Sequence, residues 1–174
     1  LKIRMSKPIL EIQNLSFQFG SNVVLKNLNL KINKCENWQI GGPSGTGKTT
    51  LAKIISGEIK NFEGNIKINF DENSELKQKV IYVANWYQFT NLEGDRNFYY
   101  QQRYNKFAKN DTLTVFAELN HFAQKEQLDF KNVEKYLEIF DFQNFKEQQL
   151  IELSSGEHKK LQLVKAFWLK PQIL

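Results

Sequence analysis

Several residue types are scarce in this chain of 174 residues, and each scarcity limits what the protein can be. The one cysteine, Cys35, excludes an intrachain disulfide and favours a reducing, cytoplasmic compartment. No apolar run approaches the ~20 residues that a membrane-spanning helix needs, and the N-terminus lacks the apolar core of a signal peptide. A place at the inner face of the cell membrane would therefore depend on another chain.

The charge balance is modest. Lysine and arginine number 24 against 19 aspartates and glutamates, a net charge of +5, and the positive residues are spread along the chain. Such an excess attracts anions, nucleotides included, but it lacks the basic block typical of nucleic-acid-binding proteins. The hydrophobic fraction of 41% is high enough for a globular core and too high for a disordered chain.

The hydrophobic pattern divides the chain into a strand-rich front and a helical back. Period-two alternation and short apolar runs predict strands over residues 9–19, 23–32, 37–42, 64–70 and 79–83. Apolar residues at helical spacing predict helices over residues 49–59, 113–128, 132–142 and 155–169. Gly57 is expected to end the first of these helices. Leu161, Val164 and Trp168 are expected to form the buried face of the last.

The stretch GGPSGTGKTT, residues 41–50, lies between a predicted strand and a predicted helix. Gly42, Gly47, Lys48 and Thr49 match the phosphate-loop pattern G-x-x-x-x-G-K-[ST]. Glycines let backbone N–H groups converge on a phosphate, and the following helix presents its free N–H groups to the anion. The lysine reaches the β- and γ-phosphates, and the threonine hydroxyl binds Mg²⁺. The residues expected to contact the phosphates of a bound nucleotide are Gly42, Pro43, Ser44, Gly45, Thr46, Gly47, Lys48, Thr49 and Thr50.

A second turn before a helix, LSSGE, occupies residues 153–157. Ser154 and Ser155 supply hydroxyl donors and Gly156 permits close approach, so the turn suits a second anion site at a helix N-terminus. The alternative is an ordinary serine N-cap with Glu157 in the first turn. In isolation the capping interpretation is favoured.

Together the two motifs resemble those of the nucleotide-binding domain of ATP-binding cassette (ABC) proteins, whose signature motif usually reads LSGGQ. The resemblance covers nearly the whole chain and implies an α/β fold, a P-loop NTPase core with an antiparallel β subdomain and a helical subdomain. It implies a partial domain over residues 1–174, incomplete at its C-terminus. The implied parts are a β-rich and P-loop part over 1–84, a helical, partner-docking part over 85–153, and the signature helix over 154–174.

The resemblance further implies that two such domains pair head to tail, with ATP and Mg²⁺ held between them. Lys48, Thr49 and Thr50 would hold one nucleotide. The γ-phosphate of the partner's nucleotide would meet the signature residues Ser154, Ser155, Gly156 and Glu157. ATP would then bridge the two surfaces, and its hydrolysis would release them.

The family also implies a base-stacking residue and a metal-binding amide. Phe19 falls where the family has an aromatic residue that stacks on adenine, and a core phenylalanine is the equal alternative. Ungapped counting puts Asn85 where the family has a glutamine that touches Mg²⁺, and Gln88 is the nearest glutamine. Both amides suit a metal-bound water. Gln88 is favoured and, with Thr49, completes the predicted metal site.

The chain departs from the family pattern at several positions. Glu157 replaces the usual glutamine, and Ser155 replaces a glycine. Cys35 stands where a glycine usually precedes a glutamate, so a strained turn is expected there. Leu174 lies where the family's next strand begins, before the Mg²⁺ aspartate, the catalytic glutamate and the switch histidine. Because phosphoryl transfer needs positioned water and neutralised charge, these residues alone are expected to bind ATP weakly at best and not to turn it over, as a piece of a longer protein.

The leading hypothesis is the ATP-binding subunit of an ABC transporter, an ATPase in its full-length form. The alternatives are a cassette of a soluble tandem ABC protein and a non-hydrolysing remnant of a truncated gene. Aromatic residues are dense over 85–107, which suits packing in the helical part or docking on a partner, in transporters the membrane subunit. Basic residues among them resemble a single-strand nucleic-acid platform, but no basic cluster accompanies them, so nucleic acid is not an expected partner.

Overall fold

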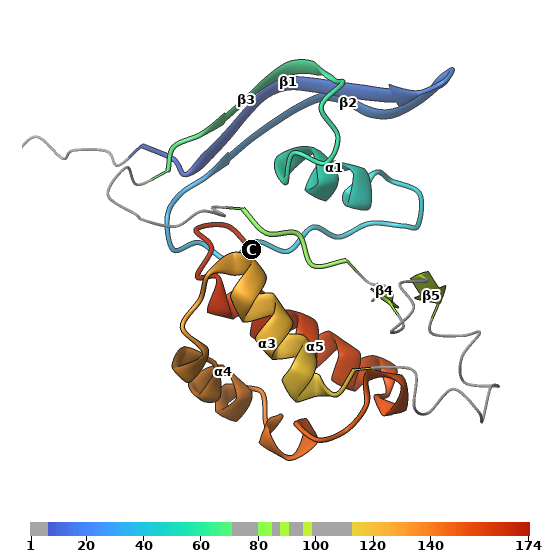
Figure 1. Ribbon diagram of the computed structural model, residues 1–174. Helices are drawn as coiled ribbons and strands as arrows, with labels where there is room; N and C mark the ends of the chain where they lie inside the picture. Colours follow the sequence, from blue (N-terminus) through green and yellow to red (C-terminus); the bar gives the residue numbers. More distant parts are fainter. Residues whose placement is uncertain (1–6, 71–79, 85–87, 91–95, 99–112) are drawn as a thin grey trace, which may run out of the picture. The chain divides into compact units, whose positions relative to one another are not determined.

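The computed structural model describes residues 7–70, 80–84, 88–90, 96–98 and 113–174, with the backbone alone at 88–90 and 96–98. The chain divides into two compact units, which are described separately (Figure 1). Unit 1 comprises Leu1–Tyr82 with Ile173, and unit 2 comprises Val83–Gln172 with Leu174. None of the described helices combines the length and the hydrophobicity that a membrane span requires.

Unit 1 contains a three-stranded antiparallel sheet in the order β2-β1-β3. The strands are β1 (Leu10–Phe19), β2 (Asn22–Ile32) and β3 (Glu63–Ile68). A tight turn joins β1 to β2, and Gly20 adopts a positive φ of 60° in it, a conformation that glycine takes without steric cost. These three strands confirm the sequence predictions, with shifts of one or two residues at their ends.

Helix α1 (Lys48–Ile55) packs its apolar side against one face of this sheet (Figure 1). The buried residues of unit 1 come from both elements: Ile9, Leu10, Ile12, Leu15, Leu51 and Ile54. Each large aliphatic side chain buried in this way contributes about 1.5–3 kcal/mol relative to an exposed one. The helix stops before Gly57, whose φ of 82° is the left-handed conformation common after a helix end, so the predicted stop is confirmed.

Two predicted strands are wrong. Residues 37–42 form no strand, and Trp38 and Ile40 are 52% and 47% exposed. The segment 79–83 contributes only an isolated parallel bridge, from Val80 to Ile173, in its described part. A strand in a sheet is stabilised by hydrogen bonds between its own N–H and C=O groups and those of a neighbouring strand. Among the described residues, the bridge from Val80 to Ile173 is the only strand-type pairing that these two apolar runs make.

Gly64, near the start of β3, lies where β3 packs so closely against β1 that only glycine fits. It adopts φ +99°, and a Cβ built there would lie 2.5 Å from the carbonyl oxygen of Asn14. Asn14 itself has a positive φ of 52° and lies at an irregularity between β1 and β3. Two backbones therefore approach more closely here than any side chain permits.

We expect Gly64→Ala to destabilise unit 1 by about 2 kcal/mol, because both the φ angle and the contact with Asn14 oppose a Cβ. Chemical unfolding followed by circular dichroism measures this loss. Gly57→Ala is the matched control, since a Cβ there meets nothing within 4 Å and only the positive φ opposes it. Equal losses in the two variants would contradict the packing argument.

Unit 2 is a small helical cluster. Its helices are α3 (Val115–Glu126), α4 (Glu134–Ile139) and α5 (Ser155–Trp168), with short 3-10 helices η2 (Phe130–Val133), η3 (Gln143–Phe145) and η4 (Leu150–Glu152). Helices α3 and α5 lie side by side in Figure 1, and the Lys165–Glu118 ion pair joins them. A two-stranded ladder of β4 (Gln88–Thr90) and β5 (Arg96–Phe98) also belongs to this unit.

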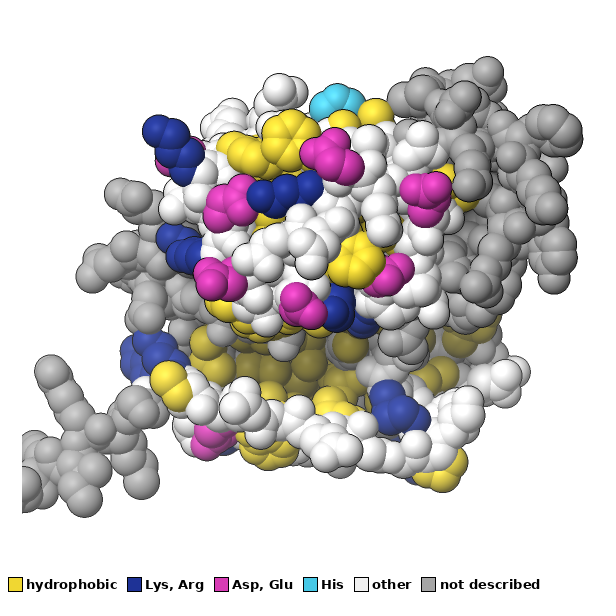
Figure 2. All heavy atoms as spheres, turned by 90° about the horizontal axis from the view of Figure 1, so that it is seen from below, with side chains coloured by type: hydrophobic (Ala, Val, Ile, Leu, Met, Phe, Trp, Pro, Cys, Tyr) yellow, Lys and Arg dark blue, Asp and Glu magenta, His cyan; other side chains and the backbone are white. Residues whose placement is uncertain are grey.

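The core of unit 2 collects apolar side chains of α3, α4 and α5. Its fully buried members include Leu119, Leu137, Leu161 and Val164, and Trp168 is 3% exposed. Leu161, Val164 and Trp168 thus form the buried face of α5, as the sequence predicts. On the face drawn in Figure 2, acidic and basic side chains are both present and are scattered among exposed hydrophobic ones.

Candidate phosphate-binding site

The loop between β2 and α1 curls around a point near its own lysine. Gly42, Gly45 and Gly47 have φ angles of 144°, 85° and 84°, a backbone form that side chains rarely adopt. A Cβ at Gly42 would lie 3.1 Å from the Thr46 hydroxyl, and a Cβ at Gly47 would lie 2.9 Å from Leu25. The glycines therefore serve both the curvature of the loop and its packing on β2.

Lys48 closes this loop through its own ammonium group. Its Nζ donates to the carbonyl oxygens of Gly42 at 2.8 Å and Pro43 at 2.6 Å, and it lies 3.4 Å from Oγ1 of Thr46. The Thr46 hydroxyl in turn donates to the Pro43 carbonyl at 3.0 Å. A cation is thus held at the centre of the glycine-rich turn, where an incoming phosphate would find it.

The N-terminus of α1 opens onto the same place. Gly47 occupies the cap position without a side chain to bond the first N–H groups, and the first turn carries no acidic residue. Uncapped N–H groups and the positive end of the helix dipole attract anions. Thr49 and the residues 42–46 are exposed, so a ligand has access to them. Backbone donors, a lysine and a hydroxyl fit a polyphosphate with a bound cation.

The signature turn shows the capping interpretation in full. Oγ of Ser154 accepts from the Glu157 N–H at 3.3 Å, and the Glu157 carboxylate accepts from the Ser154 N–H at 2.6 Å. This reciprocal capping box starts α5. Ser154, Ser155 and Gly156 remain exposed, and a Cβ at Gly156 would meet only Oγ of Ser154, at 4.0 Å. A ligand therefore has access to the turn, but the negatively charged carboxylate of Glu157 already bonds one of its N–H groups.

Of the remaining predicted site residues, Phe19 is described in full, whereas the side chains of Gln88 and Asn85 are not. Phe19 ends β1 and is 78% exposed, so in this structure it is not a core residue and its ring face is accessible. Gln88 begins β4, and its side chain is outside the described atoms. Asn85 and most of the aromatic residues over 85–107 also fall outside the described residues. The expected strain at Cys35 is confirmed by its φ of 63°.

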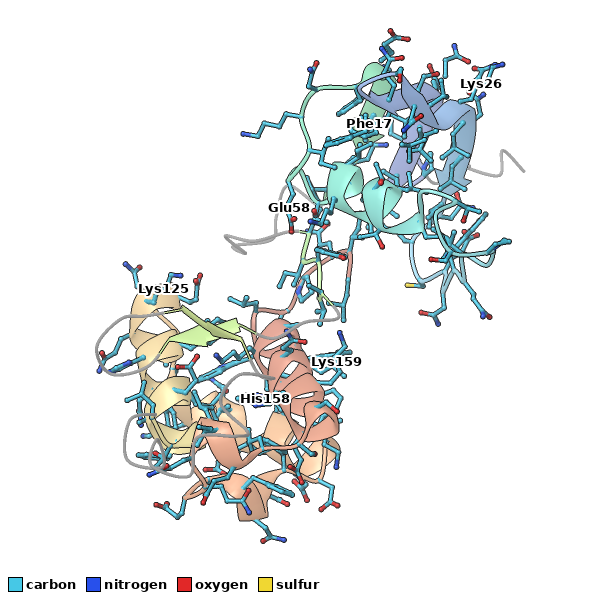
Figure 3. The ribbon with its side chains drawn as sticks, turned by 90° about the vertical axis from the view of Figure 1, so that its right-hand side faces the viewer. Phe17, Lys26, Glu58, Lys125, His158 and Lys159 are labelled. Atoms are coloured by element: carbon cyan, nitrogen blue, oxygen red, sulfur yellow. The ribbon has the colours of Figure 1, made fainter. Side chains whose placement is uncertain are left out.

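Two residues of α5 escape the sequence analysis, and Figure 3 labels both. His158 is 3% exposed, and burial lowers its pKa to about 4, against the opposing effect of the Glu157 charge. Lys159 donates to the carbonyl oxygens of Ala84 at 2.7 Å and Val83 at 3.4 Å. Burial lowers the pKa of Lys159 as well. No local sequence pattern predicts the burial of His158 or the hydrogen bonds of Lys159, because both depend on residues that are distant in the sequence.

The geometry of residues 42–49 is that of a phosphate-binding loop, which defines the class of P-loop proteins. The family model described as "ABC transporter" matches residues 25–174. The chain therefore belongs to the ABC transporter family, as the two motifs predict.

Curated relatives agree with this assignment. The chain is 28% identical over 166 residues to the probable metal transport system ATP-binding protein of Thermotoga maritima, covering 95% of this chain and 59% of that protein. It is 27% identical over 169 residues to the Fe(3+) ions import ATP-binding protein FbpC of Fusobacterium nucleatum, covering 95% and 41%. The spermidine/putrescine import ATP-binding protein PotA of the same organism is 28% identical over 174 residues, covering 98% and 42%. The chain thus spans about half the length of these relatives.

Solved structures confirm the fold class. CbiO1 from Clostridium perfringens, part of the ABC transporter complex cbiONQ, matches with a TM-score of 0.67 at 18% identity, covering 95% of this chain and 63% of that one. A nucleotide-free ATP-binding cassette from an ABC transporter matches with a TM-score of 0.61 at 19% identity, covering 94% and 66%. At these identities the likeness concerns the fold, which is the predicted P-loop NTPase fold with its β and helical parts.

Proposed function

We propose that this chain binds ATP with Mg²⁺ through residues 42–50 and forms the ATP-binding part of a transporter. The observation that carries the proposal is the geometry around Lys48, whose Nζ lies 2.8 and 2.6 Å from two carbonyl oxygens of a loop with three positive-φ glycines. That arrangement places a cation, backbone N–H groups and a helix N-terminus around one point. Triphosphate is the ligand that uses all three.

The side chains and backbone N–H groups of residues 42–50 fit ATP with Mg²⁺. Lys48 would turn from the loop carbonyls to the β- and γ-phosphates, and the N–H groups of Thr49 and Thr50 would meet the phosphate oxygens at the start of α1. The Thr49 hydroxyl would hold Mg²⁺, which neutralises phosphate charge when bound. Gln88 is the second proposed metal-site residue. Phe19 offers an exposed ring at the end of β1 for stacking on adenine.

The proposed partners are a second nucleotide-binding domain and a membrane subunit. In a head-to-tail pair, Ser154, Ser155 and Gly156 would contact the γ-phosphate bound by the other domain. The curated relatives are named for transport of metal, iron or polyamine, which supports the transporter over a soluble tandem protein. Their different cargoes leave the transported substrate unassigned.

Titration with mant-ATP, a fluorescent ATP, tests nucleotide binding directly. We expect saturable binding with a Kd between about 1 μM and 1 mM, the usual range for enzyme–substrate affinity. Unlabelled ATP, ADP and pyrophosphate should compete, because the loop contacts the β- and γ-phosphates. AMP should compete at least about tenfold less well. Equal competition by AMP, or no saturable binding, would contradict the proposed site.

Glu157 gives the proposed pairing a specific test. Its carboxylate bonds the Ser154 N–H at 2.6 Å, so a negative charge lies in the turn that would approach the γ-phosphate. We expect Glu157→Gln to strengthen ATP-dependent self-association about fivefold, since glutamine also completes a capping box but carries no charge. Sedimentation equilibrium with and without Mg-ATP measures it.

Glu152→Gln is the matched control for this prediction. Glu152 also accepts from a backbone N–H three residues earlier, Gln149, at 3.3 Å, but it lies outside the signature turn. Its replacement should leave self-association unchanged. If Glu157→Gln and Glu152→Gln behave alike, the charge of Glu157 does not face the nucleotide of a partner.

A further inference from the structure

The side chain of Thr46 has a role in the phosphate loop that the sequence pattern does not specify. The pattern G-x-x-x-x-G-K-[ST] leaves the residue types at positions 43–46 open. In the structure, Oγ1 of Thr46 donates to the Pro43 carbonyl oxygen at 3.0 Å and lies 3.4 Å from Nζ of Lys48. An unspecified position of the motif therefore contacts both the lysine and one of the carbonyls that hold it.

The direction of these hydrogen bonds follows from the groups themselves. An ammonium group only donates, and a hydroxyl group has a single proton to donate. The proton of Thr46 therefore goes to the Pro43 carbonyl, and the hydroxyl oxygen presents its lone pairs to Nζ of Lys48. The Pro43 carbonyl also accepts from Nζ at 2.6 Å, so each of its two lone pairs has a donor. Thr46 and Lys48 thus share one carbonyl.

Packing keeps the Thr46 side chain in this position. A Cβ built at Gly42 would lie 3.1 Å from Oγ1 of Thr46 and 3.9 Å from both its Cβ and its Cγ2, so the threonine occupies the space beside that glycine. Threonine is also branched at Cβ, which restricts rotation about χ1. The loop itself therefore directs the hydroxyl at the Pro43 carbonyl.

We propose that Thr46 is a positioning residue of the loop: its hydroxyl keeps the Pro43 carbonyl hydrogen-bonded when Lys48 moves from that carbonyl to a phosphate. A carbonyl oxygen that loses a charged donor beside an anion is destabilised by the missing hydrogen bond and by electrostatic repulsion. The remaining hydroxyl donor reduces both costs, so more of the lysine–phosphate interaction contributes to affinity. This role rests on the proposed function, whereas the shared carbonyl itself does not.

The shared carbonyl is tested on the chain without nucleotide. Thr46→Val keeps the branched shape and removes the hydroxyl, whereas Thr46→Ser keeps the hydroxyl. Ser56→Ala is the matched control, because Oγ of Ser56 also donates to a carbonyl three residues earlier, that of Lys53 at 3.1 Å, but at the C-terminal end of α1.

NMR measures the chemical shift of the Pro43 carbonyl carbon, which falls when a hydrogen bond to the oxygen is lost. The shift should fall in Thr46→Val and fall further when Lys48→Ala is added. It should stay at the wild-type value in Ser56→Ala. An unchanged shift in Thr46→Val would overturn the shared carbonyl and the positioning role with it.

Mant-ATP titration tests the role in binding. Thr46→Val should raise the Kd about fivefold, a loss typical of one hydrogen bond, while Thr46→Ser and Ser56→Ala should stay within about twofold of the wild type. In the Lys48→Ala background, Thr46→Val should change the Kd by less than about 1.5-fold, because the lysine that leaves Pro43 is then absent. A similar increase in both backgrounds would show that the hydroxyl does not act through Lys48, and would overturn the positioning role.

The outcomes separate this role from the proposed function. Thr46 is exposed, so its replacement should leave the unfolding midpoint unchanged, which excludes a general structural defect. A lower Pro43 carbon shift with an unchanged Kd in Thr46→Val would overturn the role in binding and retain the shared carbonyl. Absence of ATP binding in the wild type would overturn the proposed function and the role in binding together, and the NMR result would still decide the shared carbonyl.

Discussion

Replacing Lys48 by alanine is expected to weaken ATP binding at least about fiftyfold, which corresponds to ~2.3 kcal/mol. Its ammonium lies 2.8 and 2.6 Å from the carbonyl oxygens of Gly42 and Pro43, so it is at the centre of the glycine-rich loop. Phosphate would take over these charge-assisted hydrogen bonds, which are among the strongest that a side chain makes. Mant-ATP titration in excess Mg²⁺ measures the loss.

Lys53→Ala is the matched control for this variant. Lys53 belongs to the same helix but lies in its last turn, where its Nζ is 3.7 Å from the Glu58 carboxylate at an exposed position. The control should bind ATP as the wild type does, which separates the local effect of Lys48 from net charge. Both variants should retain their unfolding midpoint, since water can solvate the exposed loop carbonyls. Near-wild-type affinity in Lys48→Ala would refute the assignment of the site.

The second large effect is an acid sensitivity of unit 2 that originates at His158. Burial is the main cause that lowers the pKa of this imidazole to about 4, the Glu157 carboxylate opposes the shift, and the charge of Lys165 adds to it. The unfolded chain takes up a proton near the ordinary value of about 6.5. Between pH 6.5 and pH 4 the unfolded chain binds more protons at His158 than the folded chain does. The free energy of unfolding is therefore undiminished above pH 6.5 and falls as the pH decreases toward 4. The linked loss reaches about 3 kcal/mol at the acid end.

Urea unfolding at pH 7, 5.5 and 4.5 measures this loss when Trp168 is the fluorescent reporter. Trp168 lies in the core of unit 2 at 3% exposure, and the other two tryptophans can be replaced by phenylalanine in all variants. His158→Leu should remove most of the loss below pH 6.5, because leucine cannot charge. His121→Gln, at an exposed position of α3, should keep the loss intact. If His158→Leu and the wild type lose stability in parallel, the acid sensitivity arises elsewhere.

The N-termini of α1 and α5, described each in its own unit, differ in whether an acidic side chain already bonds their N–H groups. At α1 the cap is Gly47 and the first turn holds no acidic residue, so the free chain leaves its N–H groups to a ligand. At α5 the Glu157 carboxylate already bonds the Ser154 N–H. We therefore expect the loop around Lys48 to attract phosphate more strongly than the signature turn, where the charge of Glu157 opposes an anion.

Much of the candidate site follows from sequence alone, because its chemistry is local. Nine consecutive residues, 42–50, carry the donors, the cation and the hydroxyl, and their spacing is sufficient to identify the loop. The helices are equally local, since apolar residues at a period of 3.6 mark their buried faces and a glycine such as Gly57 marks an end. The antiparallel strands β1 and β2 need only one tight turn between them, and they too are read from the sequence.

The tertiary structure decided what depends on partners distant in the chain. The apolar run at 37–42 reads as a strand but forms none in the described structure, because strand formation depends on a neighbour's backbone and not on hydrophobicity alone. The capping role of Glu157 is local and is one of the two interpretations that the sequence offers, whereas the burial of His158 depends on tertiary packing. The contact of Lys159 with Ala84 joins residues 75 positions apart, and no periodicity or motif encodes it. Local chemistry thus fixes the identity of the loop, and only packing across the chain fixes how the signature helix is held.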